Sequence, residues 1–321
     1  MKRGFAPLCF KMKPLIAIVG PTATGKSSLA VKLAMGLNGE IVGADSRQVY
    51  HGMAIGTAQP DTEELAAAPH HLIDIIRPDE DFSLAQYRDM AYRTIDDILD
   101  RGKLPLLVGG SGLYVWTVIE GWEIPEVAPD PDLRNHLEER AGKGEAEALY
   151  RELVEADPAA AEKIDPRNIR RVIRALEVTR STGRPFSEMQ RRSAPGYDTL
   201  IIGLTAEREE LYRRTDARVD KMVESGLVEE VKKLLADGYS PELPAMSGIG
   251  YKQIVMYLRG EISLEEAVRQ MKTETHRLVR RQYNWFRLRD ERIHWFGIGQ
   301  DVVQEIKELA AGFVTGRPPT Q

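Results

Sequence analysis

Cysteine is almost absent from this sequence of 321 residues, which contains only Cys9. A single cysteine cannot build a disulfide framework or a cysteine-based zinc finger, and it is typical of proteins that fold in a reducing cytosol. Long hydrophobic runs are also missing, since none approaches the roughly 18 residues of a membrane-spanning helix. We therefore expect a cytoplasmic protein with no membrane contact and no obligate protein partner.

Positive charge is not in excess, because the formal net charge is −5 at pH 7. Overall basicity therefore cannot explain binding to nucleic acid. The hydrophobic content of 42% is sufficient for at least one large core, and the length indicates two domains of unequal size. We interpret residues 1–14 as a disordered leader, because their basic start and short apolar piece are broken by Pro7; Met12 is an alternative start to Met1.

The chain does contain a repeated alternation of strands and helices. Between two of the apolar runs, residues 84–99 repeat apolar side chains at helical spacing until Gly102 ends the pattern. This alternation predicts a P-loop NTPase-like α/β core, a parallel sheet flanked by helices, in residues 15–124 and 198–321. Four short apolar runs are typical of strands buried on both faces: residues 15–20, 39–45, 104–110 and 199–205.

Within residues 125–197, the stretch from Asp130 to about Arg192 shows helical patterns and no convincing strand. The segments EAEALYRELVEAD and RNIRRVIRALEVTRSTG are each closed by proline or glycine. We interpret this region as an all-helical domain inserted into the α/β core.

The clearest motif is GPTATGKSS, which follows the apolar run LIAIV and matches the phosphate-loop pattern G-x-x-x-x-G-K-[ST]. In such loops backbone amides and the next helix N-terminus hold phosphates, Lys26 reaches their terminal oxygens, and the Ser27 hydroxyl faces Mg²⁺. The motif alone leaves the chemistry open among kinases, NTPases and other transferases. The residues expected to bind a diphosphate are Gly20, Pro21, Thr22, Ala23, Thr24, Gly25, Lys26 and Ser27.

Two further loops follow predicted strands and bring functional groups to the same edge of the sheet. Asp45 lies in GADSRQVY, where an acidic side chain can hold Mg²⁺ through water, accept a proton, or cap the next turn. The segment GGSGLY combines glycines, which let the backbone approach a ligand closely, with the hydroxyl of Ser111.

Positive charge gathers in two stretches. Residues 167–192 contain eight arginines and two glutamates, and residues 269–289 interleave six arginines and a lysine with Tyr283, Trp285 and Phe286. Both patterns fit RNA-backbone contacts with base stacking. They also fit solvated helix faces with internal salt bridges, and the three aromatic residues also fit anchors in a core. Two such stretches in an otherwise acidic chain favour RNA.

Taken together, the segments of this chain resemble those of the tRNA dimethylallyltransferase family. The resemblance rests on GPTATGKSS, DSRQVYHGMAIGTAQP, APHHLIDI, LPLLVGGSGLY, RNIRRVIRALEV, MSGIGYKQ and RRQYNWFR, in this order. Three positions depart from the common pattern. Gln59 replaces a lysine, Ala54 replaces an aspartate, and Ser111 replaces a threonine but keeps a hydroxyl.

The resemblance implies an enzyme that transfers the dimethylallyl group of dimethylallyl diphosphate to an adenine in tRNA. The acceptor would be N6 of the adenosine 3′-adjacent to the anticodon, in tRNAs reading codons that begin with U, and diphosphate would be released. The implied partners are the tRNA anticodon stem-loop and dimethylallyl diphosphate, with Mg²⁺ as cofactor. The phosphate loop would then hold a leaving group and would not serve an ATPase.

The resemblance also implies roles for individual residues. Asp45 would be the general base, Lys26 and Ser27 would complete the catalytic set with Ser27 as the metal ligand, and Arg218 would add a cation at the diphosphate. The residues implied to contact tRNA are Asp45, Ser46, Arg47, Gln48, Ser111, Arg134, Arg167, Asn168, Ile169, Arg170, Arg171, Gly250, Tyr251, Arg280 and Arg281.

Three other classes share part of this pattern. A P-loop kinase of small molecules has the loop but does not need two arginine-rich stretches. An RNA-binding NTPase needs an acid at the end of a strand, where LPLLVGG ends in glycines. An adenylate-prenylating enzyme would have no use for the basic insertion.

Overall fold

The structure is a computed structural model, and it describes residues 13–124, 130–189, 192–193, 195–299 and 302–316. The described chain divides into two compact units. The core unit comprises Met1–Ile119 and Gly196–Gln321, and the insert unit comprises Glu120–Pro195. Most of the predicted leader lies outside the described residues, and the first strand begins at Lys13, two residues before the predicted core. The functional division into domains stays a prediction.

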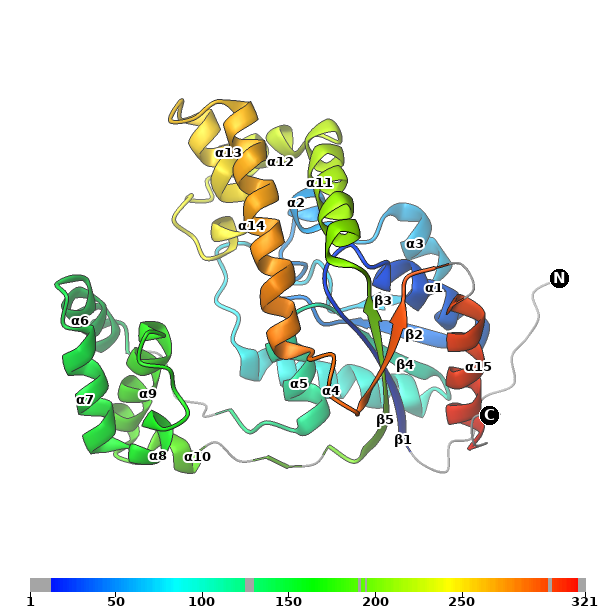
Figure 1. Ribbon diagram of the computed structural model, residues 1–321, viewed down its shortest axis with the longest axis horizontal. Coiled ribbons are helices and arrows are strands. Elements are labelled where there is room, and N and C mark those ends of the chain that lie inside the picture. Colours follow the sequence, from blue (N-terminus) through cyan, green and yellow to red (C-terminus); the bar gives the residue numbers. More distant parts are fainter. Residues whose placement is uncertain (1–12, 125–129, 190–191, 194, 300–301, 317–321) are drawn as a thin grey trace. The chain divides into compact units, whose positions relative to one another are not determined.

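A six-stranded parallel sheet forms the centre of the core unit, in the order β3-β2-β4-β1-β5-β6 (Figure 1). The four predicted strands are confirmed. Two short edge strands, β3 and β6, were not predicted. The strands are β1 (Lys13–Val19), β2 (Gly39–Gly43), β3 (His70–His71), β4 (Leu104–Val108), β5 (Tyr197–Thr205) and β6 (Ile293–Gly297).

Helices and connecting segments surround this sheet and extend the core unit beyond it. The Ser83–Gln86 capping box begins α4, so the predicted helix over residues 84–99 is confirmed. The helices are α1 (Lys26–Leu37), α2 (Ala54–Thr57), α3 (Thr62–Ala67), α4 (Leu84–Asp100), α5 (Gly112–Glu120), α11 (Arg208–Glu224), α12 (Leu227–Ala236), η1 (Ala245–Ser247), α13 (Tyr251–Leu258), α14 (Leu264–Trp285) and α15 (Val302–Thr315).

Burial on both faces of the sheet explains its apolar strands. Alternate residues of β1, Ile16 and Ile18, pack in one cluster with Leu33 of α1 and Ile306 of α15. Helices α11 to α14 share a second cluster that includes Val219, Val231, Ile254 and Met271. No helix in the part of the chain that the structure describes combines the length and the apolarity needed to cross a bilayer.

A buried carboxylate fastens the edge strand β3 to the sheet. Glu40 of β2 accepts hydrogen bonds from Arg101 at 2.6 and 2.8 Å and from Lys103 at 2.5 Å. His71 Nε2 of β3 lies 2.8 Å from the same carboxylate. Hydrogen bonds from Arg101, with those from Lys103 and His71, hold the pKa of Glu40 at about 2, well below its usual value.

The insert unit is a small helical bundle with its own core. Its buried residues include Leu137, Leu153, Val172 and Leu176. Gly183 ends α9 in the left-handed region, at φ 67°. The helices are α6 (Pro131–Gly142), α7 (Ala146–Ala156), α8 (Pro158–Ala161), α9 (Ile169–Thr182) and α10 (Phe186–Met189).

The two ends of the insert unit are hydrogen-bonded to each other. The Ser193 amide donates to the Gly121 carbonyl at 2.8 Å. Beside it, Trp122 and Arg192 form an isolated antiparallel bridge. The chain therefore enters and leaves the insert unit at one place.

Candidate functional site

The phosphate loop links β1 to α1 at the carboxyl edge of the sheet, where open α/β folds bind ligands. Gly20 has φ 130°, and a Cβ there would lie 2.2 Å from the Leu204 carbonyl oxygen, so only glycine fits. Thr24 Oγ1 donates to the Pro21 carbonyl at 2.9 Å and holds the loop closed on itself. No side chain caps the N-terminus of α1 after Gly25, so its first amides are left for an anion.

Two cations accompany this loop. Lys26 Nζ donates to the Pro21 carbonyl at 2.6 Å. Burial, together with the nearby Arg218 guanidinium, lowers the pKa of Lys26 to about 7, while Asp45 opposes this shift. Burial also lowers the pKa of Arg218 on α11, and the Asp45 charge opposes that shift as well. The structure therefore brings the cations Lys26 and Arg218 and the carboxylate of Asp45, which are far apart in the sequence, together at this loop.

Asp45 lies two residues beyond the end of β2, and its carboxylate is only partly used by its own loop. Oδ1 accepts from the Arg47 amide at 2.9 Å, which is the local turn contact that its position allows. The side chain is half-buried, and Oδ2 has no hydrogen-bond partner among the residues described. One carboxylate oxygen therefore remains to accept a bond from a ligand.

The loop after β4 lies against the loop after β2. A Cβ on Gly109 would lie 2.0 Å from the Ala44 carbonyl oxygen, so glycine permits this approach. Ser111 Oγ accepts from the Ser46 amide at 3.0 Å and lies 3.2 Å from Ser46 Oγ. The structure thus brings Ser111 and Ser46, both predicted tRNA contacts, to one place beside Asp45.

The segment after Ser46 is held by bonds to its own backbone and to η1. Arg47 donates to the Pro244 carbonyl at 2.8 Å. Gln48 Nε2 donates to the Ala58 carbonyl at 2.7 Å, and Gln59 Nε2 donates to the Gln48 carbonyl at 3.0 Å. The amides of Gln48 and Gln59 therefore shape this segment.

The C-terminal helices fix the same segment through a carboxylate that sequence reasoning missed. Glu230 accepts from the amides of Ile55 at 2.7 Å and Gly56 at 3.0 Å, and from the Tyr251 hydroxyl at 2.7 Å. The Tyr251 side chain is 1% exposed, so it supports the segment and offers no surface for RNA. The Gly250 amide donates to Gln253 Oε1 at 2.9 Å.

Several arginines of the insert unit are paired internally. Arg134 donates to Glu177 at 2.9 and 3.0 Å, and Arg174 donates to the same fully buried carboxylate at 3.0 Å. Arg180 pairs with Glu152. The salt-bridge interpretation therefore applies to part of this basic stretch, and Arg134 and Arg174 stabilise the bundle.

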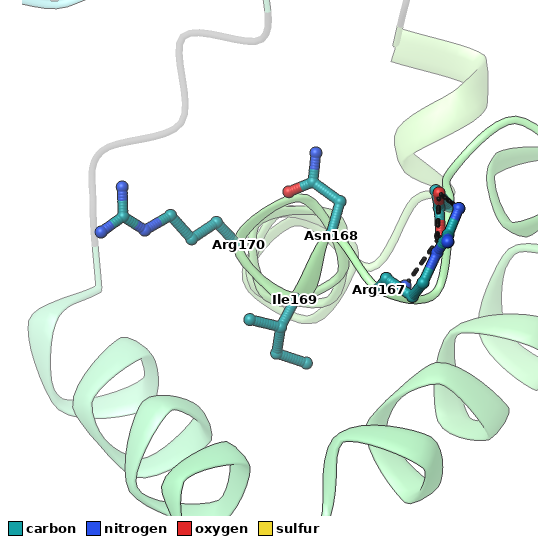
Figure 2. Close-up of a pocket in the computed structure, with 5 residues that line it drawn as sticks. Arg167, Asn168, Ile169 and Arg170 are labelled. Carbon is teal, nitrogen blue, oxygen red and sulfur yellow. Dashed lines mark hydrogen bonds and ion pairs between the residues drawn. The ribbon is translucent and has the colours of Figure 1, made fainter. Parts of the chain in front are cut away.

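A pocket lies at the start of α9 and is lined by Asp165, Arg167, Asn168, Ile169 and Arg170 (Figure 2). The Asn168 side chain caps the helix, accepting from the Arg171 amide at 3.4 Å, and Arg167 is paired with Asp165 at 2.7 Å. The guanidinium groups of Arg170 and Arg171 are exposed and have no ion-pair partner among the described residues. The predicted residues 167–171 thus lie together at a helix N-terminus, which attracts anions.

The second basic stretch forms most of α14. Arg280 donates to the Tyr212 hydroxyl at 2.7 Å, and Arg281 is exposed. The three aromatic residues do not share one role. Phe286 is fully buried and Tyr283 is bonded to Thr205 at 2.7 Å, whereas Trp285 is 41% exposed.

The donor set of the site fits Mg²⁺ only with help from a ligand. Ser27 is exposed in the first turn of α1, and no group of three acidic, histidine or cysteine side chains among the described residues resembles a metal cage. Mg²⁺ commonly takes one or two protein oxygens, several waters and substrate phosphates. Ser27 is therefore the residue that would hold it, together with a bound diphosphate.

These features define a class of protein: a P-loop α/β protein that binds phosphates at the carboxyl edge of its sheet. A family model described as IPP transferase matches residues 48–289. The chain belongs to the IPP transferase family.

Relatives and solved structures agree with this assignment. The chain is similar to a tRNA dimethylallyltransferase of Dehalococcoides mccartyi, with 50% identity over 94% of this chain and 93% of the relative. One of Roseiflexus sp. is 55% identical over 86% and 90%.

The tRNA isopentenylpyrophosphate transferase of Bacillus halodurans has a similar structure, with a TM-score of 0.71, 43% identity, and coverage of 95% of this chain and 97% of that one. A eukaryotic dimethylallyltransferase acting on tRNA has a TM-score of 0.81 at 29% identity, over 96% and 81%. The predicted P-loop NTPase-like fold is confirmed.

Proposed function

We propose that this protein transfers the dimethylallyl group of dimethylallyl diphosphate to N6 of the adenosine 3′-adjacent to the anticodon in tRNA. The observation that carries the proposal is the convergence of Lys26, Arg218 and Asp45 at the phosphate loop of a chain in the IPP transferase family. Two cations suit the diphosphate that leaves, and one carboxylate suits the amine that attacks the dimethylallyl carbon. We assign the protein to the cytoplasm, where tRNA is modified.

The leaving diphosphate would lie against the amides at the start of α1, with Lys26 and Arg218 at its oxygens. Negative charge grows on the bridging oxygen as the carbon–oxygen bond breaks. Fixed donors in a crowded site stabilise such charge without having to reorganise. Mg²⁺ held at Ser27 would supply further positive charge to the same oxygens.

Asp45 would act on the acceptor. An exocyclic adenine amine is a weak nucleophile, and it must lose a proton as it forms the new bond to carbon. The carboxylate oxygen of Asp45 that is not bonded to Arg47 can accept that proton. Ser111 and Ser46, linked to each other at 3.2 Å, would bind the base or its ribose beside it.

The basic residues of the insert unit and α14 would contact the RNA backbone. Arg170 and Arg171 at the start of α9, with Arg280 and Arg281 on α14, are exposed and suit phosphate contacts. The acceptor base would have to leave its stack in the loop, which costs a few kcal/mol and is easier in a single-stranded loop than in a duplex.

Transfer of radiolabel tests the proposal directly. Unmodified tRNA incubated with labelled dimethylallyl diphosphate and Mg²⁺ should become labelled, and Lys26→Ala should abolish the label, because one lost electrostatic donor costs several kcal/mol in such sites. ATP should not be hydrolysed above background with or without tRNA, because no acidic residue follows β4 to orient water. Release of phosphate from ATP that tRNA stimulates and Lys26→Ala removes would restore the NTPase alternative.

A further inference from the structure

Gln282 joins the two loops that face each other at the ligand edge of the sheet. It lies in the last turn of α14, and its side chain is 6% exposed. Its Oε1 accepts from the Thr22 amide of the phosphate loop at 2.9 Å. Its Nε2 donates to the Gly110 carbonyl at 3.1 Å. One buried amide group thus bonds to both loops at once.

The space for this contact depends on glycine. A Cβ on Gly110 would lie 2.3 Å from Gln282 Nε2, so a side chain there would push the amide away. Gly110 directly precedes Ser111, whose hydroxyl is bonded to Ser46. A displacement of Gln282 would therefore act on the phosphate loop on one side and on the residues beside Asp45 on the other.

Two exposed arginines lie just before Gln282 on α14. Arg281 directly precedes it and Arg280 lies one residue earlier, and Arg280 also donates to the Tyr212 hydroxyl of α11. A helix moves as a unit because its residues are linked by backbone hydrogen bonds. A shift of the end of α14 that carries these arginines would therefore move the Gln282 backbone, and with it the amide that bonds to both loops.

We propose that Gln282 is a positioning residue that links α14 to the diphosphate site. This proposal rests on the proposed function, in which α14 contacts tRNA. RNA held by α14 sets the position of the Gln282 amide, which sets the phosphate loop and the Gly110 carbonyl. RNA and diphosphate affinities are then coupled, and the coupling is reciprocal.

The test compares pyrophosphate affinity with and without RNA. Calorimetry measures pyrophosphate binding to the full chain in the absence and presence of a saturating unmodified anticodon stem-loop. In the wild type we expect the stem-loop to tighten pyrophosphate binding about 5-fold or more, the lower end of common coupling strengths. In Gln282→Met, which keeps the length of the side chain and loses both hydrogen bonds, we expect a ratio close to 1.

Thr275→Val is the matched control. Thr275 lies on the buried side of the same helix, and its hydroxyl donates only within that helix, to the Met271 carbonyl at 2.8 Å. This variant should keep the wild-type ratio. Gly110→Ala approaches the contact from the opposite side and should also lower the ratio, so the proposal can be tested even if Gln282→Met does not fold.

Two outcomes overturn the proposal: a wild-type ratio of 1, or wild-type ratios in both Gln282→Met and Gly110→Ala. Label transfer measured on the same wild-type sample separates this failure from failure of the proposed function. If the wild type transfers the label but the ratios do not depend on Gln282, only the positioning role is wrong. If no label is transferred, the proposed function itself is wrong.

Discussion

The protonation state of Lys26 gives a pH prediction with a defined sign. The pKa of this ammonium group is lowered to about 7 in the free protein, chiefly by burial and then by the Arg218 charge. A pKa of about 7 leaves about half of the Lys26 side chains neutral at pH 7 and about nine-tenths neutral at pH 8. A bound diphosphate favours the charged form, because opposite charges within a few ångströms attract strongly in a crowded site.

Binding of pyrophosphate should therefore take up a proton at this residue. The uptake is about 0.5 proton at pH 7 and about 0.9 at pH 8, and affinity from this group should fall by up to about tenfold per pH unit above 7. Calorimetry in buffers with different ionisation enthalpies measures the uptake. Lys26→Arg is the control, because a guanidinium stays charged throughout this range.

Pyrophosphate and its Mg²⁺ complex also titrate, but they do so equally with both proteins. The difference between wild type and Lys26→Arg therefore isolates Lys26. Equal proton uptake by the two proteins at pH 8 would refute the reasoning, because it would show that Lys26 is already charged in the free protein.

Three further predictions concern other parts of the structure. Asp45→Asn keeps the shape of the side chain and removes the proton acceptor, so single-turnover transfer should fall by roughly 10²–10⁴ with little change in tRNA binding; a change of only a few-fold would place the base elsewhere. Arg170→Ala should weaken tRNA binding and reduce the slope of log K against log salt by about 0.7, and an unchanged slope would show that Arg170 contacts no phosphate. Arg174→Ala breaks a pair with buried Glu177 and should instead lower the melting temperature of the protein. Glu40, whose pKa is lowered to about 2, contributes stability that is present above about pH 4.5 and is lost as the pH falls towards 2. Glu40→Gln should therefore lower the free energy of unfolding by roughly 3 kcal/mol at pH 7, measured by chemical denaturation, and the difference from wild type should shrink in acid. A difference that does not depend on pH would contradict this account.

Local patterns explain which parts of the fold could be predicted. The phosphate loop and four strands are readable because a few adjacent residues determine each of them. Strand β3 is only two residues long and exists because it pairs with the edge of β2, so His70 and His71 carry no periodic signal. Strand β6 is partly exposed at the other edge and follows a charged stretch, which hid it in the same way.

The same distinction applies to the site. Asp45 and Lys26 follow strands and could be placed by their position in a motif. Glu230 lies 175 residues from Ile55 and Gln282 lies 260 residues from Thr22, and no local pattern marks either side chain. Counting charges also overstated the free basic surface, because it cannot show that Arg134 and Arg174 converge on one buried glutamate.

The hydrogen-bonded ends of the insert unit have a consequence for how such a chain can change over time. Since the Ser193 amide and the Gly121 carbonyl lie 2.8 Å apart, the whole bundle acts on the sheet as a short connection between α5 and β5. The entropy of closing that connection then depends little on how many residues the bundle contains. We therefore expect that helices of the insert unit can be added, lengthened or exchanged with little effect on the stability of the sheet. The core should also fold with a bundle from a relative whose ends form the same bridge.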